Sequence, residues 1–207
     1  LLPGSAAIGE EGAAKKPQIL DLLEDSEPLW LIDPVDGTHN FAHGDPRFAV
    51  MMALVMGRET VAGWIYEPLR DSMAIAEKGG GAWLDGKKMT VADTRSKKRL
   101  NGYAGWSGRK KIQKYLGSEF STLTSLRCVG IEYRNIANGD ADFAVYSRLK
   151  PWDHAPGELL FREAGGMSAM QIGKAPYRPH LYGNNGMVLA TDRRLISKLK
   201  SAMAGHA

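Results

Sequence analysis

Trp30-Leu31-Ile32 runs directly into Asp33-Pro34-Val35-Asp36-Gly37-Thr38, and this junction of an apolar run with an acidic loop decides the fold around it. Pro34 disfavours a helical backbone at Asp33, so the loop is expected to follow a strand. Two carboxylates three residues apart in a stiffened loop can hold Mg²⁺, which prefers oxygen ligands. Asp, Pro and Gly are also common turn formers, so the loop by itself is more simply explained as a turn.

The loop offers more than its carboxylates. The Val35 carbonyl can turn toward a metal ion, and Gly37 allows the backbone to approach a phosphate closely. The amides of Gly37 and Thr38 could donate to phosphate oxygens, and the Thr38 hydroxyl could orient a metal-bound water. Two similar patterns fail on spacing. Haloacid-dehalogenase phosphatases need Asp where Val35 stands, and an EF-hand needs Glu at its twelfth position, which is Gly44 here.

Composition narrows the class of protein. The 207 residues suit one domain or two small joined lobes. A net charge of +4 suits an anionic substrate but is too small to argue for nucleic acid. The single cysteine, Cys128, excludes an intrachain disulfide and a Cys₄ zinc site, so a reducing cytoplasm is the expected location. The longest apolar run, residues 48–56, is far shorter than the roughly 20 residues of a membrane-spanning helix.

Hydrophobic patterning predicts two halves of different character. The first half reads as a meandering antiparallel sheet, with strands at 30–32, 48–56, 60–66 and 73–76 and a hairpin turn at Asp85-Gly86. The second half mixes strands with helices. Its strands are predicted at 101–106, 126–129, 143–146 and 187–190, and its helices at 110–116, 131–137, 153–164 and after a capping Thr191.

The chain has two basic clusters near its middle, Lys97-Lys98-Arg99 and Arg109-Lys110-Lys111. Their simplest explanation is a solvated surface, and a partner-binding patch is the alternative.

Two further motifs flank the acidic loop, and the three together carry a resemblance. Gly9-Glu10-Glu11 precedes the loop and Trp152-Asp153-His154-Ala155 follows it. In this order they resemble the inositol monophosphatase superfamily, as do Asn40-Phe41 and Arg162-Glu163-Ala164-Gly165-Gly166. The resemblance implies an α+β fold, a layered α/β/α/β/α sandwich of the sugar-phosphatase type. It implies one domain over 1–207, with halves at about 1–106 and 107–207.

The resemblance also implies a site and a chemistry. Two or three Mg²⁺ ions, for which Mn²⁺ could substitute, would be held by Glu10, Asp33, the Val35 carbonyl, Asp36 and Asp153. Glu10, Asp33 and Thr38 would be catalytic, with Glu10 and Thr38 acting on the attacking water. The expected reaction is direct in-line attack by metal-bound hydroxide on a phosphate monoester. Glu11 is more simply a solvated carboxylate.

Substrate contacts are expected from residues on several segments, namely Asp36, Gly37, Thr38, Gly130, Glu132, Arg148 and Asp153. The chain departs from the family here, because the usual Gly-(Ser/Thr)-Ala element reads Gly130-Ile131-Glu132 and a usual Glu is replaced by Tyr146. Glu132 and Arg148 could take over these contacts, or Arg148 could simply pair with a surface acid. Inositol 1-phosphate is the leading substrate. Fructose 1,6-bisphosphate, histidinol phosphate and 3′-phosphoadenosine nucleotides are the alternatives.

The remaining expectations also come from the resemblance. Family members form homodimers and are lithium-sensitive, and the bacterial members called SuhB add a role in transcription and ribosome maturation, so a transcription-machinery partner is an alternative function. Members usually have two helices before the Gly-Glu-Glu motif. Only nine residues precede Glu10 here, so a longer natural protein is expected. His39 is most simply explained as a loop residue without a catalytic role, and His154 as a residue at the start of a helix.

Overall fold

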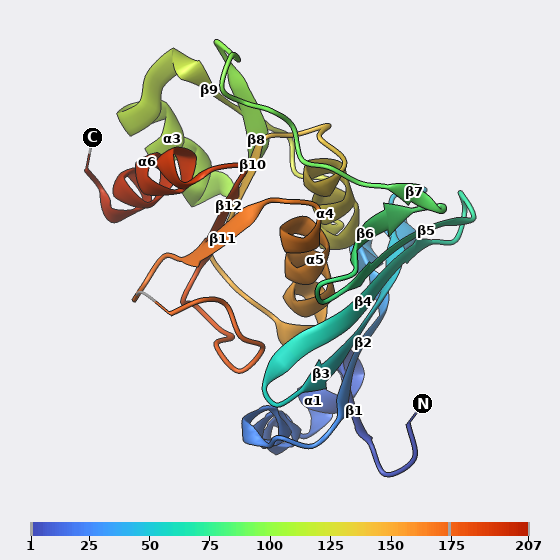
Figure 1. The fold of residues 1–207 in the computed structure, drawn as a ribbon. Helices are drawn as coiled ribbons and strands as arrows, with labels where there is room; N and C mark the ends of the chain where they lie inside the picture. Colours follow the sequence, from blue (N-terminus) through green and yellow to red (C-terminus); the bar gives the residue numbers. More distant parts are fainter. Residues whose placement is uncertain (1, 174, 207) are drawn as a thin grey trace.

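Two β-sheets with helices between them make up the computed structural model, which describes residues 2–173 and 175–206 (Figure 1). The first sheet contains seven strands in the order β1-β2-β3-β4-β5-β6-β7. They are β1 (Ala6–Gly9), β2 (Leu29–Asp36), β3 (Ala49–Met56), β4 (Glu59–Glu67), β5 (Ser72–Glu77), β6 (Gly81–Leu84) and β7 (Lys87–Lys88). From β2 onward every neighbouring pair is antiparallel, which confirms the predicted meander. Strand β1 instead pairs in parallel with β2.

Strand β3 shows why this sheet has one face in the core. Its residues Ala49, Met51, Ala53 and Val55 are buried, whereas the residues between them are partly or fully exposed. This period of two matches the alternation of side chains along a pleated strand. The buried face is rich in small residues, which leaves room for a helix to lie close against it.

The second sheet has five strands in the order β11-β12-β10-β8-β9. They are β8 (Leu100–Ala104), β9 (Phe120–Leu123), β10 (Phe143–Tyr146), β11 (Met167–Met170) and β12 (Met187–Ala190). The helices α3 (Trp106–Leu116) and α6 (Arg193–Ala204) cover its outer face (Figure 1). Leu195 and Leu199 of α6 pack with Ile112 of α3 and Phe143 of β10 in a second core cluster. The division predicted at about residue 106 falls after β8, the first strand of this sheet.

The helices α4 (Val129–Ala137) and α5 (Pro151–Glu163) form the layer between the sheets (Figure 1). Every residue of α5 from Pro151 to Phe161 is buried. Two glycines allow this. A Cβ added at Gly63 of β4 would lie 2.9 Å from Pro156 Cα, and one added at Gly157 would lie 2.1 Å from the Tyr133 ring. The layers therefore run sheet, helices, sheet, helices, in agreement with the expected α+β layered class.

Two local predictions are wrong. Residues 126–129 were expected to be a strand, but Arg127 has φ +54° and α4 begins at Val129, so the strand here is β9 at 120–123. A left-handed residue cannot continue a strand. Thr191 was expected to cap the last helix. The cap is Asp192, which accepts a 2.8 Å hydrogen bond from the Leu195 amide, while the Thr191 hydroxyl bonds to Thr94.

Short helical pieces complete the chain. They are α1 (Glu10–Lys15), α2 (Thr38–Ala42) and two 3₁₀ segments at Pro17–Glu24 and Gly117–Glu119. Across residues 2–173 and 175–206, no helix has both the length and the apolar character needed to cross a membrane.

The contact between α5 and α4 gives a stability test. Gly157→Ala forces a methyl group into the Tyr133 ring, so it should lower the free energy of unfolding by about 2 kcal/mol. For a chain of this length, that is a fall in Tm of about 4–8 °C. The control is Gly12→Ala in α1, where a Cβ meets nothing within 4 Å. Thermal unfolding checks both, and equal Tm values for the two variants would contradict the packing described.

Candidate active site

Parallel pairing of β1 and β2 brings the first two acidic motifs together. Gly9, the last residue of β1, pairs with Ile32 of β2, so Glu10 and Asp33 both follow the same register position. Because parallel strands end at the same edge of a sheet, the two carboxylates lie at one edge. The charge of Glu10 is one of the influences on the pKa of Asp33.

The acidic loop itself is held by its own hydrogen bonds. Asp33 Oδ1 accepts from the Val35 amide at 3.0 Å, and the Thr38 hydroxyl donates to the Val35 carbonyl at 3.0 Å. Gly37 has φ +89°, and a Cβ there would lie 2.9 Å from the Arg47 carbonyl oxygen. Only glycine fits this position easily, both for its left-handed backbone and for the space available.

Asp36 is tied to the start of α4. Its Oδ2 accepts from the Gly130 amide at 2.6 Å and from the Cys128 thiol at 3.1 Å. Burial raises the pKa of Asp36, and these donors oppose the rise. Cys128 and Asp36 are 92 residues apart, so their contact could not be predicted from neighbouring residues. A buried carboxylate needs hydrogen-bond donors, and this requirement is the signal that could have indicated them.

Asp153 comes from the first turn of α5 and completes the carboxylate group. Its pKa is raised to about 8 by burial and by the charge of Asp36. The pKa of Asp33 is raised to about 6, again by burial first and then by Asp36. The charge of Asp36 acts on both Asp33 and Asp153, and Asp33 acts on Asp153 as well, so carboxyls from two different elements lie near one another. Asp153 Oδ1 is buried and has no hydrogen-bond partner.

Lys150 is the cation of this site, and the sequence analysis did not assign it a role. Its ammonium forms an ion pair with Glu10. It also lowers the pKa of Asp36 and of Asp153, opposing the effect of burial on those carboxyls. Lys150 lies three residues before Asp153, about one helical turn away, and this spacing is the sequence signal that could have placed it at the site.

The donor set suits a hard metal ion. Within residues 2–173 and 175–206, no three His, Cys, Asp or Glu side chains already have the arrangement of a metal centre. The chemistry nevertheless fits, because Glu10, Asp33, Asp36 and Asp153 offer only oxygens, as Mg²⁺ prefers. The pKa values of Asp33 and Asp153 are raised first by burial and then by the charge of Asp36, and a bound cation would offset both effects. The unpartnered Asp153 Oδ1 is an oxygen still available to such an ion.

A pocket of about 260 Å³ is lined by three of the predicted substrate residues, Glu132, Arg148 and Asp153. Glu132 is buried and fully engaged. It accepts from the Ser125 hydroxyl and the Leu126 amide at 2.9 Å, and from the Tyr146 hydroxyl at 3.2 Å. Arg148 is exposed, and its guanidinium forms no ion pair within the described part of the chain. Arg148 is therefore the more accessible of the two.

The two histidines considered from the sequence, His154 and His39, differ in their burial. His154 is buried, with Nδ1 2.9 Å from the Tyr133 hydroxyl and Nε2 3.1 Å from the Arg148 carbonyl oxygen, so both ring nitrogens are already engaged. His39 is exposed, stacks on His43, and lies 3.0 Å from the Arg127 guanidinium. Glu11 is exposed, as its solvated explanation requires.

One sequence pattern was overlooked. Cys128 and Arg134 have the Cys-x₅-Arg spacing of phosphatases that use a cysteine nucleophile. The Cys128 thiol is buried, and that burial raises its pKa well above the usual range. Arg134 Nε lies 3.0 Å from Glu67 Oε1 in an ion pair. A protonated, inaccessible thiol is a poor nucleophile, so the spacing is incidental here.

Known proteins resemble the whole chain. The model described as "Inositol monophosphatase family" matches residues 1–205. A fructose-1,6-bisphosphatase/inositol-1-monophosphatase of Thermotoga maritima is 28% identical over 209 residues, which cover 98% of this chain and 77% of the relative. A Nus factor SuhB of Xylella fastidiosa is 34% identical over 175 residues, 79% of this chain and 60% of the relative. The solved structure of a Thermotoga maritima IMPase superposes with a TM-score of 0.80 at 25% identity, covering 99% of this chain and 77% of that one.

The crowded carboxyls predict a pH dependence. Both pKa values lie above the ordinary 3.8, so the folded chain favours the neutral carboxyls. Their contribution to stability is present below pH 3.8 and is lost as the pH rises through about 6 for Asp33 and about 8 for Asp153. In EDTA, Asp153→Asn should therefore raise the free energy of unfolding at high pH by about 1.4 kcal/mol or more, the equivalent of one pKa unit.

Urea unfolding in the alkaline range and again in mild acid would check this. The gain should shrink toward acid pH, and Glu11→Gln, which changes an exposed carboxylate, should alter neither value. A loss of stability in Asp153→Asn at high pH would contradict the crowding.

Proposed function

We propose that this chain, which belongs to the inositol monophosphatase family, hydrolyses a small phosphate monoester with Mg²⁺, and that inositol 1-phosphate is its first candidate substrate. One observation carries the proposal. Asp153 of α5 lines a pocket together with Lys150, the ion-pair partner of Glu10 of α1, and the charges of Asp36 and Asp33 at the end of β2 both act on Asp153. These are the three motifs through which the sequence resembles that family.

The proposed metal ligands are Glu10, Asp33, Asp36, Asp153 and the Val35 carbonyl, with Mn²⁺ as a possible substitute ion. Bound Mg²⁺ would supply positive charge against the phosphate dianion and lower the pKa of a coordinated water. For Glu10 to act as a ligand, its ion pair with Lys150 must be rearranged. Lys150 would then be free to offset charge on the substrate side of the pocket, which it also lines.

The chain's own residues would position the reactants. The Thr38 hydroxyl donates its hydrogen bond to the Val35 carbonyl, so its oxygen can accept a hydrogen bond from a water molecule. Glu10 is the most exposed of the four proposed carboxylate ligands, since Asp33, Asp36 and Asp153 are buried. It is the proposed acceptor of that water's proton. Water oxygen bonds to phosphorus as its proton passes to Glu10, the ester P–O bond breaks, and the leaving alkoxide takes a proton from solvent. With Cys128 excluded as a nucleophile, no phosphoenzyme is expected, and trapping a covalent phosphoenzyme in a quenched single turnover would contradict direct attack by water.

Substrate binding is proposed for Gly37, Thr38 and Gly130 near the phosphate and for Arg148 at the rim of the pocket. Glu132 was a candidate from the sequence, but both of its oxygens accept hydrogen bonds from protein groups. We therefore propose that Glu132 braces the pocket wall.

Replacing one proposed ligand tests the reaction. Asp36→Asn keeps an oxygen to accept from Gly130 and Cys128 but removes the charge. It should lower kcat by about 10³-fold, a loss of about 4 kcal/mol of transition-state stabilisation. Glu11→Gln removes a nearby exposed carboxylate and should leave kcat unchanged. Similar losses in both variants, or full activity in Asp36→Asn at unchanged Tm, would contradict the assignment.

A substrate panel with Mg²⁺ tests the specificity. It should contain inositol 1-phosphate, fructose 1,6-bisphosphate, histidinol phosphate and a 3′-phosphoadenosine nucleotide. We expect the highest kcat/KM with inositol 1-phosphate. Turnover of the nucleotide with none of inositol 1-phosphate would reject the first candidate while keeping the hydrolytic chemistry.

A regulatory role is the second candidate, supported by the similarity to a relative named Nus factor SuhB. A transcription-machinery partner, a homodimer and inhibition by lithium are proposals that rest on the same resemblance. Asp36→Asn separates the two roles, because a partner-binding function should survive the loss of turnover.

A further inference from the structure

Positive charge is concentrated in one segment of the chain. Residues 95–122 contain eight lysines and arginines and one carboxylate, Glu119, for a net charge of +7. The whole chain carries only +4, so the rest of it is acidic on balance, at −3. The segment spans the approach to β8, the helix α3 and the strand β9. A modest total charge therefore conceals a strongly basic face.

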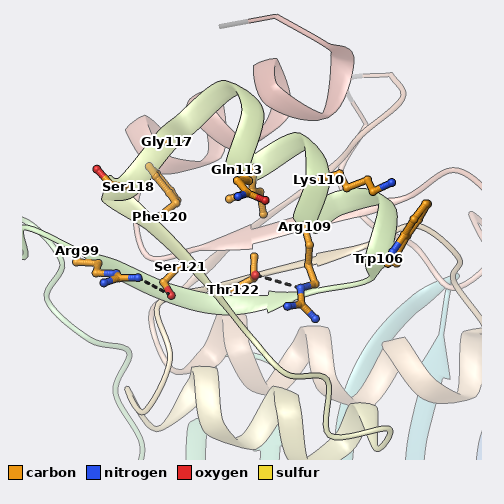
Figure 2. Close-up of a pocket in the computed structure, with 11 residues that line it drawn as sticks. Arg99, Trp106, Arg109, Lys110, Gln113, Gly117, Ser118, Phe120, Ser121 and Thr122 are labelled. Carbon is orange, nitrogen blue, oxygen red and sulfur yellow. Dashed lines mark hydrogen bonds between the residues drawn. The ribbon is translucent and has the colours of Figure 1, made fainter.

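This face contains a cavity of about 680 Å³ between α3 and β9, drawn in Figure 2. Arg99, Arg109 and Lys110 line it, and no acidic residue is among the described residues of its wall. Hydroxyls of β9 hold both arginines in place. Arg99 donates to Ser121 at 3.3 Å, and Arg109 donates to Thr122 at 3.2 Å. Each guanidinium keeps further N–H groups for an anion, and neither belongs to an ion pair within the described residues.

An exposed aromatic ring stands at one end of the cavity (Figure 2). Trp106 is 74% exposed, the highest value among the large hydrophobic side chains of the described residues. The ammonium of Lys110 lies 3.6 Å from the centre of its ring. A ring held beside fixed cations is the arrangement on which nucleic-acid bases stack while phosphates meet arginine.

The basic surface continues beyond this cavity. Two neighbouring cavities have Phe120 in common with it. Arg95, Lys97, Lys98 and Arg193 line them, together with one carboxylate, Glu119, which pairs with Lys198. A mononucleotide would contact the first cavity alone. Three neighbouring cavities, in whose walls cations outnumber the one carboxylate, suit an extended polyanion better.

We propose that the face formed by α3, β9 and the loop before β8 binds single-stranded nucleic acid, with a base stacked on Trp106 and backbone phosphates on Arg99 and Arg109. An anionic membrane fits less well. The surface is concave, and the apolar residue Ile112 of α3 is buried in the core, so α3 has no free apolar face to insert. The proposal is independent of the proposed hydrolysis, although Gly105, in the wall of the catalytic pocket, directly precedes Trp106.

The test uses fluorescence anisotropy of labelled oligonucleotides, a 12-mer of uridine and a 12-mer of thymidine, titrated with the full chain over a range of salt concentrations. The two arms distinguish RNA from DNA. Trp106→Ala should weaken binding by about 10-fold, the loss of one stacked base, with the salt slope unchanged. Arg99→Gln/Arg109→Gln should reduce the slope of log K against log salt by about 1.4, the value for two phosphate contacts with a single strand.

The matched control is Lys15→Gln/Lys16→Gln, which removes two equally exposed charges from the first half of the chain and should change neither quantity. Hydrolysis by the double arginine variant should equal that of the parent. The proposal is overturned if the parent binds neither oligonucleotide, or if the control weakens binding as much as the arginine variant. It is also overturned if phosphatidylserine vesicles bind the parent while oligonucleotides do not, or if Trp106→Ala converts a dimer to a monomer without affecting oligonucleotide binding.

Discussion

Burial of neighbouring carboxyl groups is the constraint on which this structure depends. Asp33, Asp36 and Asp153 are buried within reach of one another, and each would ionise more readily in water. The surrounding structure limits the cost. The start of α4 supplies an amide and a thiol to Asp36, and Lys150 supplies a positive charge. The fold thus gives up stability at this point in order to concentrate anionic oxygen, and a cation can recover that loss by binding.

The same constraint explains which parts of the molecule must fit closely. Asp153 reaches the other carboxyls because α5 lies almost against the first sheet, where Gly63 leaves room for Pro156. On its other side α5 meets Tyr133 through Gly157. A larger residue at either glycine would move the helix, and with it the carboxylate. The packing of α5 in the interior therefore determines where the charge of Asp153 lies in the site.

Local patterns in the sequence were enough to predict much of this. The alternation along β3 and the junction of Ile32 with Asp33 can be recognised from neighbouring residues alone. The three ordered motifs then indicated which carboxylates belong to the site. What was missed depends on distant residues. Cys128 contacts Asp36 across 92 positions, and Lys150 meets Glu10 across 140. Residues 126–129 are apolar enough for a strand, but the left-handed backbone of Arg127 and the bonds from Ser125 and Leu126 to Glu132 make them a loop. The substrate pocket is the part least visible in the sequence, because its wall is built from such contacts.

The short strand β7 has a consequence for the behaviour of the chain in concentrated solution. It ends the first sheet with only two residues, Lys87 and Lys88, and both are exposed. An incoming strand from another molecule would find few free backbone groups there and would have to dehydrate two ammonium groups to reach them. The seven-stranded sheet is therefore closed to growth at this edge by length and charge, a protection against aggregation that needs no covering element.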